Sequence, residues 1–165
     1  MCPNQQPQPR PRILVDADSC PVVDDIASLA HNWGIRVFLI SNICHDFSSL
    51  HDVSIIRVDN TPEAADFALV NHSQPGDIVV TQDIGVACMV LGKKAKPLSP
   101  RGHIYREQDI VSLMEMRHIM QKAKRRGQLR GGLKRFSDTD RKRFLKNLKL
   151  LVSLCQKEGA DGSRD

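Results

Sequence analysis

Short apolar runs alternate with segments of helical periodicity along the first two thirds of the chain. Short apolar runs are typical of buried strands, and those that fit are 13–16, 37–40, 54–59, 78–81 and 95–98. Between them, apolar residues recur every three or four positions, which predicts helices over 21–33, 61–72 and 84–91. Strands that alternate with helices form right-handed crossovers and a parallel sheet. We therefore predict an α/β fold with a central, mainly parallel sheet.

The last third of the chain predicts two longer helices. An amphipathic helix is expected from about residue 107 to 126, and Gly127 is placed to end it. The segment 137–140, Ser-Asp-Thr-Asp, predicts the cap of a final helix that continues through Cys155. The sequence thus adds a helical part to the C-terminal side of the sheet.

The length of 165 residues suits one compact domain. We expect a Pro/Gln-rich disordered tail at 1–12, a single domain over 13–157 and a short tail at 158–165. No apolar run approaches the ~18 residues of a membrane span, and the N-terminal tail lacks the apolar core of a signal peptide. Five scattered cysteines without a Cys-x-x-Cys pair argue against a disulfide framework. A cytoplasmic protein with no membrane partner is the expectation.

Charge divides the chain into two unlike parts. Residues 1–116 hold 9 Lys and Arg against 14 Asp and Glu, whereas residues 117–149 hold 13 against 2. We expect nucleic acid, RNA in the first place, to bind through 117–149. A solvated basic helix without a partner is the alternative. Because aromatic residues are only 4% of the chain, phosphate contact without base readout is expected.

Carboxylates follow three of the predicted strands. The carboxyl ends of neighbouring parallel strands converge at one edge of a sheet, where α/β proteins hold their ligands. Clustered carboxylates favour Mg²⁺ or Mn²⁺, ions that can support phosphodiester hydrolysis. The alternative is that these residues cap helices or face solvent. The candidate metal ligands are Asp16, Asp18, Glu63, Asp66 and Asp83, with Ser19 and Thr81 in support.

Five segments together resemble one known family. ILVDADSCPV, EAADFALV, GDIVVTQDIGVA, SPRG and FSDTDRKRF look like the YaiI/YqxD family of small bacterial proteins, itself similar to PIN-like nucleases, over about residues 12–149. The resemblance implies a three-layer α/β/α PIN-like sandwich. It also implies an acidic cluster that binds Mg²⁺ or Mn²⁺ and cleaves RNA, as in the wider PIN-like group.

The resemblance carries over to single residues. Asp16 matches the first acid of the PIN-like pattern, and Asp66 and Asp83 match the family's later acids. Glu63 stands where the family often has Asp, which preserves the charge. Arg101 matches the arginine of the family's Pro-Arg-Gly turn, and Arg117 matches an arginine in its long helix. Two departures, Lys124 for an arginine and Leu133 for a proline, affect the expected substrate surface.

Three functional hypotheses follow. The first is a metal-dependent nuclease in which Asp16, Asp66 and Asp83 are catalytic. Its candidate nucleic-acid contacts are Arg101, Arg117, Lys124, Arg126, Arg130, Arg135, Arg141 and Lys142. The second is a haloacid-dehalogenase-like phosphatase with Asp16 as nucleophile. It is less favoured because residues 95–106 contain no acid. The third is a non-catalytic RNA-binding protein.

Overall fold

The computed structural model describes residues 11–42, 46–61, 63–128 and 134–161. Its centre is a five-stranded sheet in the order β3-β2-β1-β4-β5, in which every pair of neighbours is parallel. The strands are β1 (Ile13–Asp16), β2 (Val37–Ser41), β3 (Val53–Arg57), β4 (Ile78–Val80) and β5 (Lys96–Leu98). The α/β prediction with a mainly parallel sheet is confirmed.

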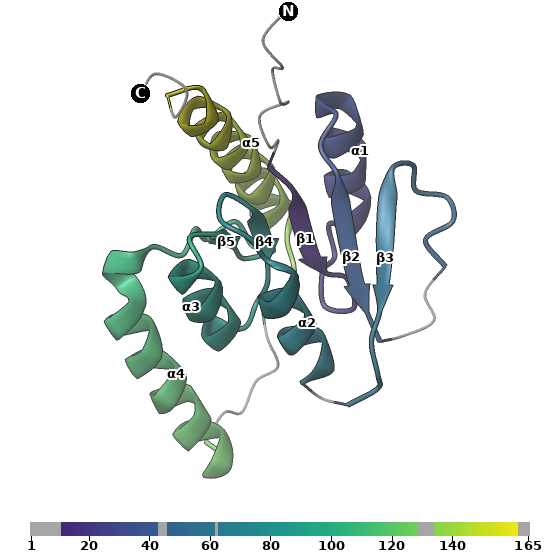
Figure 1. Ribbon diagram of the computed structural model, residues 1–165. Helices are drawn as coiled ribbons and strands as arrows, with labels where there is room; N and C mark the ends of the chain where they lie inside the picture. Colours follow the sequence, from purple (N-terminus) through teal and green to yellow (C-terminus); the bar gives the residue numbers. More distant parts are fainter. Residues whose placement is uncertain (1–10, 43–45, 62, 129–133, 162–165) are drawn as a thin grey trace, which may run out of the picture.

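Helices cover both faces of the sheet (Figure 1). They are α1 (Val23–Trp33), α2 (Ala64–His72), α3 (Ile84–Gly92), the short 3₁₀ helix η1 (Glu107–Asp109), α4 (Ile110–Arg125) and α5 (Asp138–Asp161). One apolar core lies between the sheet and helices α1 and α5, and a second lies between the sheet and helices α2 and α3. The molecule is therefore a three-layer α/β/α sandwich.

The side-chain alternation of β1 shows why the sheet is covered on both faces. Ile13 and Val15 point into the core under α1 and α5, whereas Leu14 points into the core under α2 and α3. A strand buried on both faces reads as a continuous apolar run, which is why β1 could be found from sequence. Strand β3 lies at the edge of the sheet and is mostly exposed, and it ends two residues before the end of the strand expected over 54–59.

The two basic helices differ in how they join the fold. Helix α5 is a layer of the sandwich, because Phe144, Leu148 and Leu151 are buried in the first core. Helix α4 packs beside α3, and Leu113 is its buried contact. Its far end extends away from the sheet (Figure 1). The helical C-terminal part is therefore one structural layer and one projecting arm.

Two details differ from the expected boundaries. Arg12, which the sequence assigns to the N-terminal tail, pairs with Asp77, and its carbonyl accepts the N–H of Ile78 at 2.9 Å. Helix α1 begins at Val23 after a turn, although Pro21 is a favourable first residue. Among the described residues, every helix is too short or too polar to cross a bilayer.

Candidate active site at the carboxyl edge of the sheet

Asp16 is the last residue of β1 and lies at the carboxyl edge of the sheet. Its side chain is half-buried, and the Ser19 hydroxyl donates to its Oδ2 at 2.6 Å. Burial raises the pKa of Asp16, and the nearby charge of Asp18 raises it further. Ser19 thus holds the orientation of the Asp16 carboxylate.

Asp18 faces a different neighbour. Its Oδ1 accepts the hydroxyl of Ser41, and its Oδ2 accepts the backbone N–H of Asn42, each at 2.6 Å. Both carboxylate oxygens are therefore used to tie the turn after β1 to the end of β2. This placement makes Asp18 a positioning residue in our account, rather than one of the ligands at the centre of the site.

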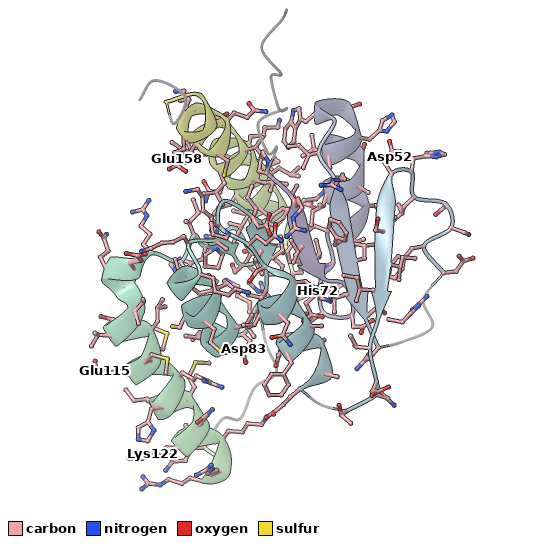
Figure 2. All side chains as sticks on the ribbon, in the orientation of Figure 1. Asp52, His72, Asp83, Glu115, Lys122 and Glu158 are labelled. Atoms are coloured by element: carbon pink, nitrogen blue, oxygen red, sulfur yellow. The ribbon has the colours of Figure 1, made fainter. Side chains whose placement is uncertain are left out.

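Asp83 begins helix α3 just beyond β4. Its Oδ1 accepts the N–H of Val86 at 2.9 Å, and its own N–H donates to the buried Thr81 hydroxyl at 3.1 Å. These bonds make Asp83 a helix N-cap, the alternative that the sequence left open. Because β1 and β4 are parallel neighbours, Asp83 follows β4 at the edge of the sheet where β1 ends in Asp16. Figure 2 shows Asp83 in this part of the molecule.

Asp66 lies in the first turn of α2, and the charges of the other acidic residues affect its pKa. Burial raises its pKa most, and the negative charges of Asp83, Asp16 and Glu63 raise it further, in that order. The charge of Arg117 acts in the opposite direction. The structure therefore brings the expected carboxylates of three segments into one electrostatic neighbourhood.

Arg117 enters this neighbourhood from α4, across the surface of Gly85. A β-carbon added at position 85 would lie 2.5 Å from Nη1 of Arg117 and 2.9 Å from Oδ1 of Asp83. The missing side chain at Gly85 thus makes the space in which the guanidinium lies beside Asp83. Sequence reasoning quoted Gly85 within a motif but gave it no role.

The donor set fits a hard divalent cation. Asp16, Asp66 and Asp83 offer carboxylate oxygens, the ligands that Mg²⁺ and Mn²⁺ prefer. Two of the three carboxylates have raised pKa values, so their negative charge is disfavoured and a cation would relieve that cost. In the described part of the chain, no three acidic, histidine or cysteine side chains are already gathered around one point. The metal site therefore stays a prediction.

The expected nucleic-acid contacts divide into two groups. Arg101 pairs with Asp140 at 2.7 Å, and Arg141 pairs with Asp25 at 2.6 Å, so both arginines fasten α5 to the body. Arg141 is nevertheless exposed, and the other exposed members of the set are Lys124, Arg126, Arg135 and Lys142. Arg130 lies outside the described residues. Phosphate contact is thus better supplied by the projecting arm than by Arg101 or Arg141.

The motif SPRG and the start of α5 interlock. Ser137 and Asp140 form a reciprocal capping box, in which each backbone N–H donates to the other side chain. The backbone N–H of Ser137 lowers the pKa of Asp140 most. Gly102 lies so close to α5 that a β-carbon there would be 2.6 Å from the backbone nitrogen of Phe144. These two motifs therefore have a structural function.

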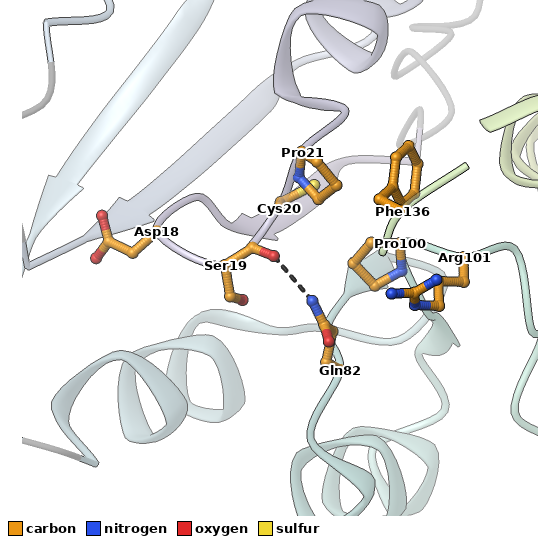
Figure 3. Close-up of a pocket in the computed structure, with 8 residues that line it drawn as sticks. All are labelled: Asp18, Ser19, Cys20, Pro21, Gln82, Pro100, Arg101 and Phe136. Atoms are coloured by element: carbon orange, nitrogen blue, oxygen red, sulfur yellow. Dashed lines mark hydrogen bonds between the residues drawn. The ribbon is translucent and has the colours of Figure 1, made fainter. Parts of the chain in front are cut away.

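A pocket of about 330 Å³ opens beside the acidic edge (Figure 3). Within it, Nε2 of Gln82 donates to the Ser19 carbonyl at 2.9 Å. Burial raises the pKa of the adjoining Cys20 to about 12, which argues against a thiolate nucleophile. The pocket is lined by Asp18, Ser19, Cys20, Pro21, Gln82, Pro100, Arg101 and Phe136.

Comparison with known proteins adds the family. Residues 14–154 match the model described as "Uncharacterized BCR, YaiI/YqxD family". A UPF0178 protein of Shouchella clausii is 38% identical over 146 residues, which cover 88% of this chain and 95% of that protein. A UPF0178 protein of Ruminiclostridium cellulolyticum is 41% identical over 154 residues, covering 93% and 97%. No solved structure matches the chain, so the likeness to PIN-like nucleases stays a prediction. The chain belongs to the YaiI/YqxD family.

Proposed function

We propose that this protein is a metal-dependent phosphodiesterase that cleaves nucleic acid, RNA in the first place. One observation carries the proposal. The Asp66 carboxylate is partly buried, and its pKa is raised by this burial and by the charges of Asp83, Asp16 and Glu63. The charge of Arg117 also acts on this carboxylate. Concentrated negative charge that costs stability is the mark of a functional site rather than of a solvated surface.

The three acids Asp16, Asp66 and Asp83 would hold Mg²⁺ or Mn²⁺. Such an ion supplies Lewis-acid stabilisation of a phosphate and a more acidic bound water. Ser19 holds the Asp16 carboxylate through Oδ2, and the N-cap of α3 holds Asp83 through Oδ1. Preorganised carboxylates lower the reorganisation needed during reaction. Glu63, exposed at the start of α2, contributes negative charge at the rim.

Arg117 is the residue best placed to bind the reacting phosphate. Its guanidinium is permanently charged, partly buried and adjacent to Asp83. Arginine offers paired donors that match phosphate oxygens. We assign it the binding of a non-bridging oxygen and the stabilisation of the charge that develops there.

The rest of α4 extends this phosphate contact. Its last turn carries Lys122, Lys124 and Arg125, all exposed, at the end that points away from the sheet (Figure 2). A strand cut at the acidic edge would run along this basic face, and the contacts that α4 makes would be to the backbone of the strand. This placement would give a function to the basic residues at the end of α4.

The test is cleavage of a pool of end-labelled RNAs by purified protein with Mg²⁺ or Mn²⁺. We expect cutting by the wild type, loss of cutting with EDTA, and at least a hundredfold loss in Asp16→Asn. Glu115→Gln, an exposed acid on α4, is the matched control and should cut at the wild-type rate. Equal cutting by Asp16→Asn and wild type would refute the proposal.

The non-catalytic RNA-binding hypothesis has one observation in its favour. The carboxylate of Asp83 already serves as the N-cap of α3, which is a sufficient structural reason for an acid at that position. This hypothesis expects RNA binding that EDTA and Asp16→Asn leave unchanged, together with no cutting under any metal. The same set of assays therefore separates the two.

A further inference from the structure

Two hydrogen bonds of Ser19 connect the pocket with the acidic edge of the sheet. Ser19 donates its hydroxyl to Asp16 and offers its carbonyl to the side chain of Gln82. Gln82 itself stands between Thr81 and Asp83 in the sequence. A group in this pocket would therefore lie next to a phosphate bound at Asp16 and Asp83.

One side of the pocket is apolar, and polar side chains line the rest. Pro21, Pro100 and the ring of Phe136 supply the flat surfaces (Figure 3). The Arg101 guanidinium lies 5.9 Å from the centroid of the Phe136 ring, and Asp140 holds that arginine at 2.7 Å. Because the arginine is fixed by its ion pair, the ring that it covers is held in place as well.

The size and polarity of the pocket suit one planar ring. At about 330 Å³ it is at the small end of ligand pockets, so it accommodates a single base-sized group rather than a peptide. Its polar lining residues are Asp18, Ser19, Gln82 and Arg101. The Gln82 amide presents both donors and acceptors to the edge of a base. An aromatic face beside an amide is a common way of holding an unstacked base.

We infer that this pocket binds a nucleobase of a single-stranded substrate, next to the phosphate that is cut. The inference rests on the proposed function for the position of that phosphate. A base within a duplex is stacked on its neighbours and cannot enter, so the pocket selects single strands or unpaired ends. The low aromatic content of the chain is compatible with this, because one base needs only one ring.

The test measures binding without chemistry. A fluorescein-labelled ten-nucleotide oligouridylate and a ten-unit abasic ribose-phosphate strand of equal charge are titrated with protein in EDTA, and fluorescence anisotropy gives each Kd. We expect wild type to bind the base-bearing strand about tenfold more tightly than the abasic one. Phe136→Leu should reduce this preference to less than about twofold.

Phe38→Leu is the matched control. Phe38 is also partly buried beneath an arginine, with the Arg12 guanidinium 5.3 Å from its ring centroid, but it lies on β2 in the second core. It should keep the full preference for bases. Thermal unfolding of both variants confirms that they fold, and the comparison of two strands on wild type needs no variant at all.

The outcomes are distinct from those of the cleavage assay. Equal affinity of wild type for the two strands, no binding of either, or a preference that survives in Phe136→Leu would overturn the inference. A base preference in EDTA together with no cutting in any metal would instead leave the base pocket standing and refute only the phosphodiesterase.

Discussion

The guanidinium of Arg117 lies where the side chain of residue 85 would be if that residue were not glycine. An alanine β-carbon at position 85 would be 2.5 Å from Nη1 of Arg117 and 2.9 Å from its Cζ. Two elements that are far apart in sequence, the start of α3 and the middle of α4, are thereby joined at the proposed site. The absence of one methyl group sets the position of Arg117, whose charge acts on Asp66.

Gly85→Ala should lower cleavage by about 10- to 100-fold, because it displaces the arginine that binds the phosphate. The arginine is the far end of a flexible side chain, but the β-carbon would also lie 2.9 Å from Oδ1 of Asp83, the N-cap of α3. We therefore expect a loss of stability of about 1 kcal/mol. Rates with Mn²⁺ and thermal unfolding measure the two effects. Gly92→Ala, in the same helix with nothing within 4 Å of an added β-carbon, is the control and should retain activity. An active Gly85→Ala would contradict the role of Arg117.

Asp66→Asn should stabilise the protein at neutral pH while it abolishes cleavage. The pKa of Asp66 is raised in the folded state, so folding favours its protonated form and ionisation at pH 7 costs stability. Removing the charge should raise Tm by about 1–3 °C at pH 7. The difference should vanish below the unfolded pKa, where the wild-type carboxyl is protonated in both states. A lower Tm at pH 7 would show that the carboxylate is structural.

Asp16 and Asp18 should respond in opposite ways to the same substitution. Asn at position 18 can still accept the Asn42 N–H, but it turns an amide N–H toward the Ser41 hydroxyl, which must reverse its bond. Both bonds also lose the negative charge of their acceptor. We expect Asp18→Asn to lower the free energy of unfolding by about 1–3 kcal/mol. Asp16→Asn can still accept from Ser19 and should be at least as stable as wild type, but inactive. Urea unfolding of the two proteins compares them, and equal losses would remove the distinction.

Gly102→Ala should be far more destabilising than Gly76→Ala, although both glycines have φ near +87°, at +88° and +86°. An L-residue in this backbone region costs about 1–2 kcal/mol. At position 102 the added β-carbon would also collide with the backbone of α5, 2.6 Å from the nitrogen of Phe144, whereas at 76 it meets nothing within 4 Å. We expect at least about 2 kcal/mol of further loss at 102. Similar losses of unfolding free energy in the two variants would show that α5 can shift to make room for the β-carbon at little cost.

The fold was predictable because its central strands are apolar on both faces. The run Ile13 to Val15 marks β1 as a buried parallel strand, and the acids that follow it mark the edge where the site lies. Strand β3 departs from this because it is an edge strand, and Ile55 is 39% exposed. A residue's position within the sheet depends on pairing between distant segments, which local patterns do not carry.

The division of labour among the charged residues was not predictable. In the sequence, the spacing Asp-x-Asp makes Asp16 and Asp18 equally good candidates for metal ligands. In the fold, hydrogen bonds from Ser41 and Asn42 hold the Asp18 carboxylate at the end of β2. Likewise, Arg101 and Arg141 look like phosphate ligands in the sequence but pair with Asp140 and Asp25 in the fold. Which charge meets which depends on tertiary contacts across 39 and 116 residues.

The central claim is that Asp16, Asp66 and Asp83 form one divalent-cation site. Electron paramagnetic resonance of a Mn²⁺ titration, with and without an oligouridylate present, tests it most directly. We predict one bound Mn²⁺ per chain, with binding weakened at least tenfold in Asp16→Asn and in Asp66→Asn but unchanged in Glu115→Gln. No bound Mn²⁺ in either condition, or equal binding by all four proteins, would contradict the claim.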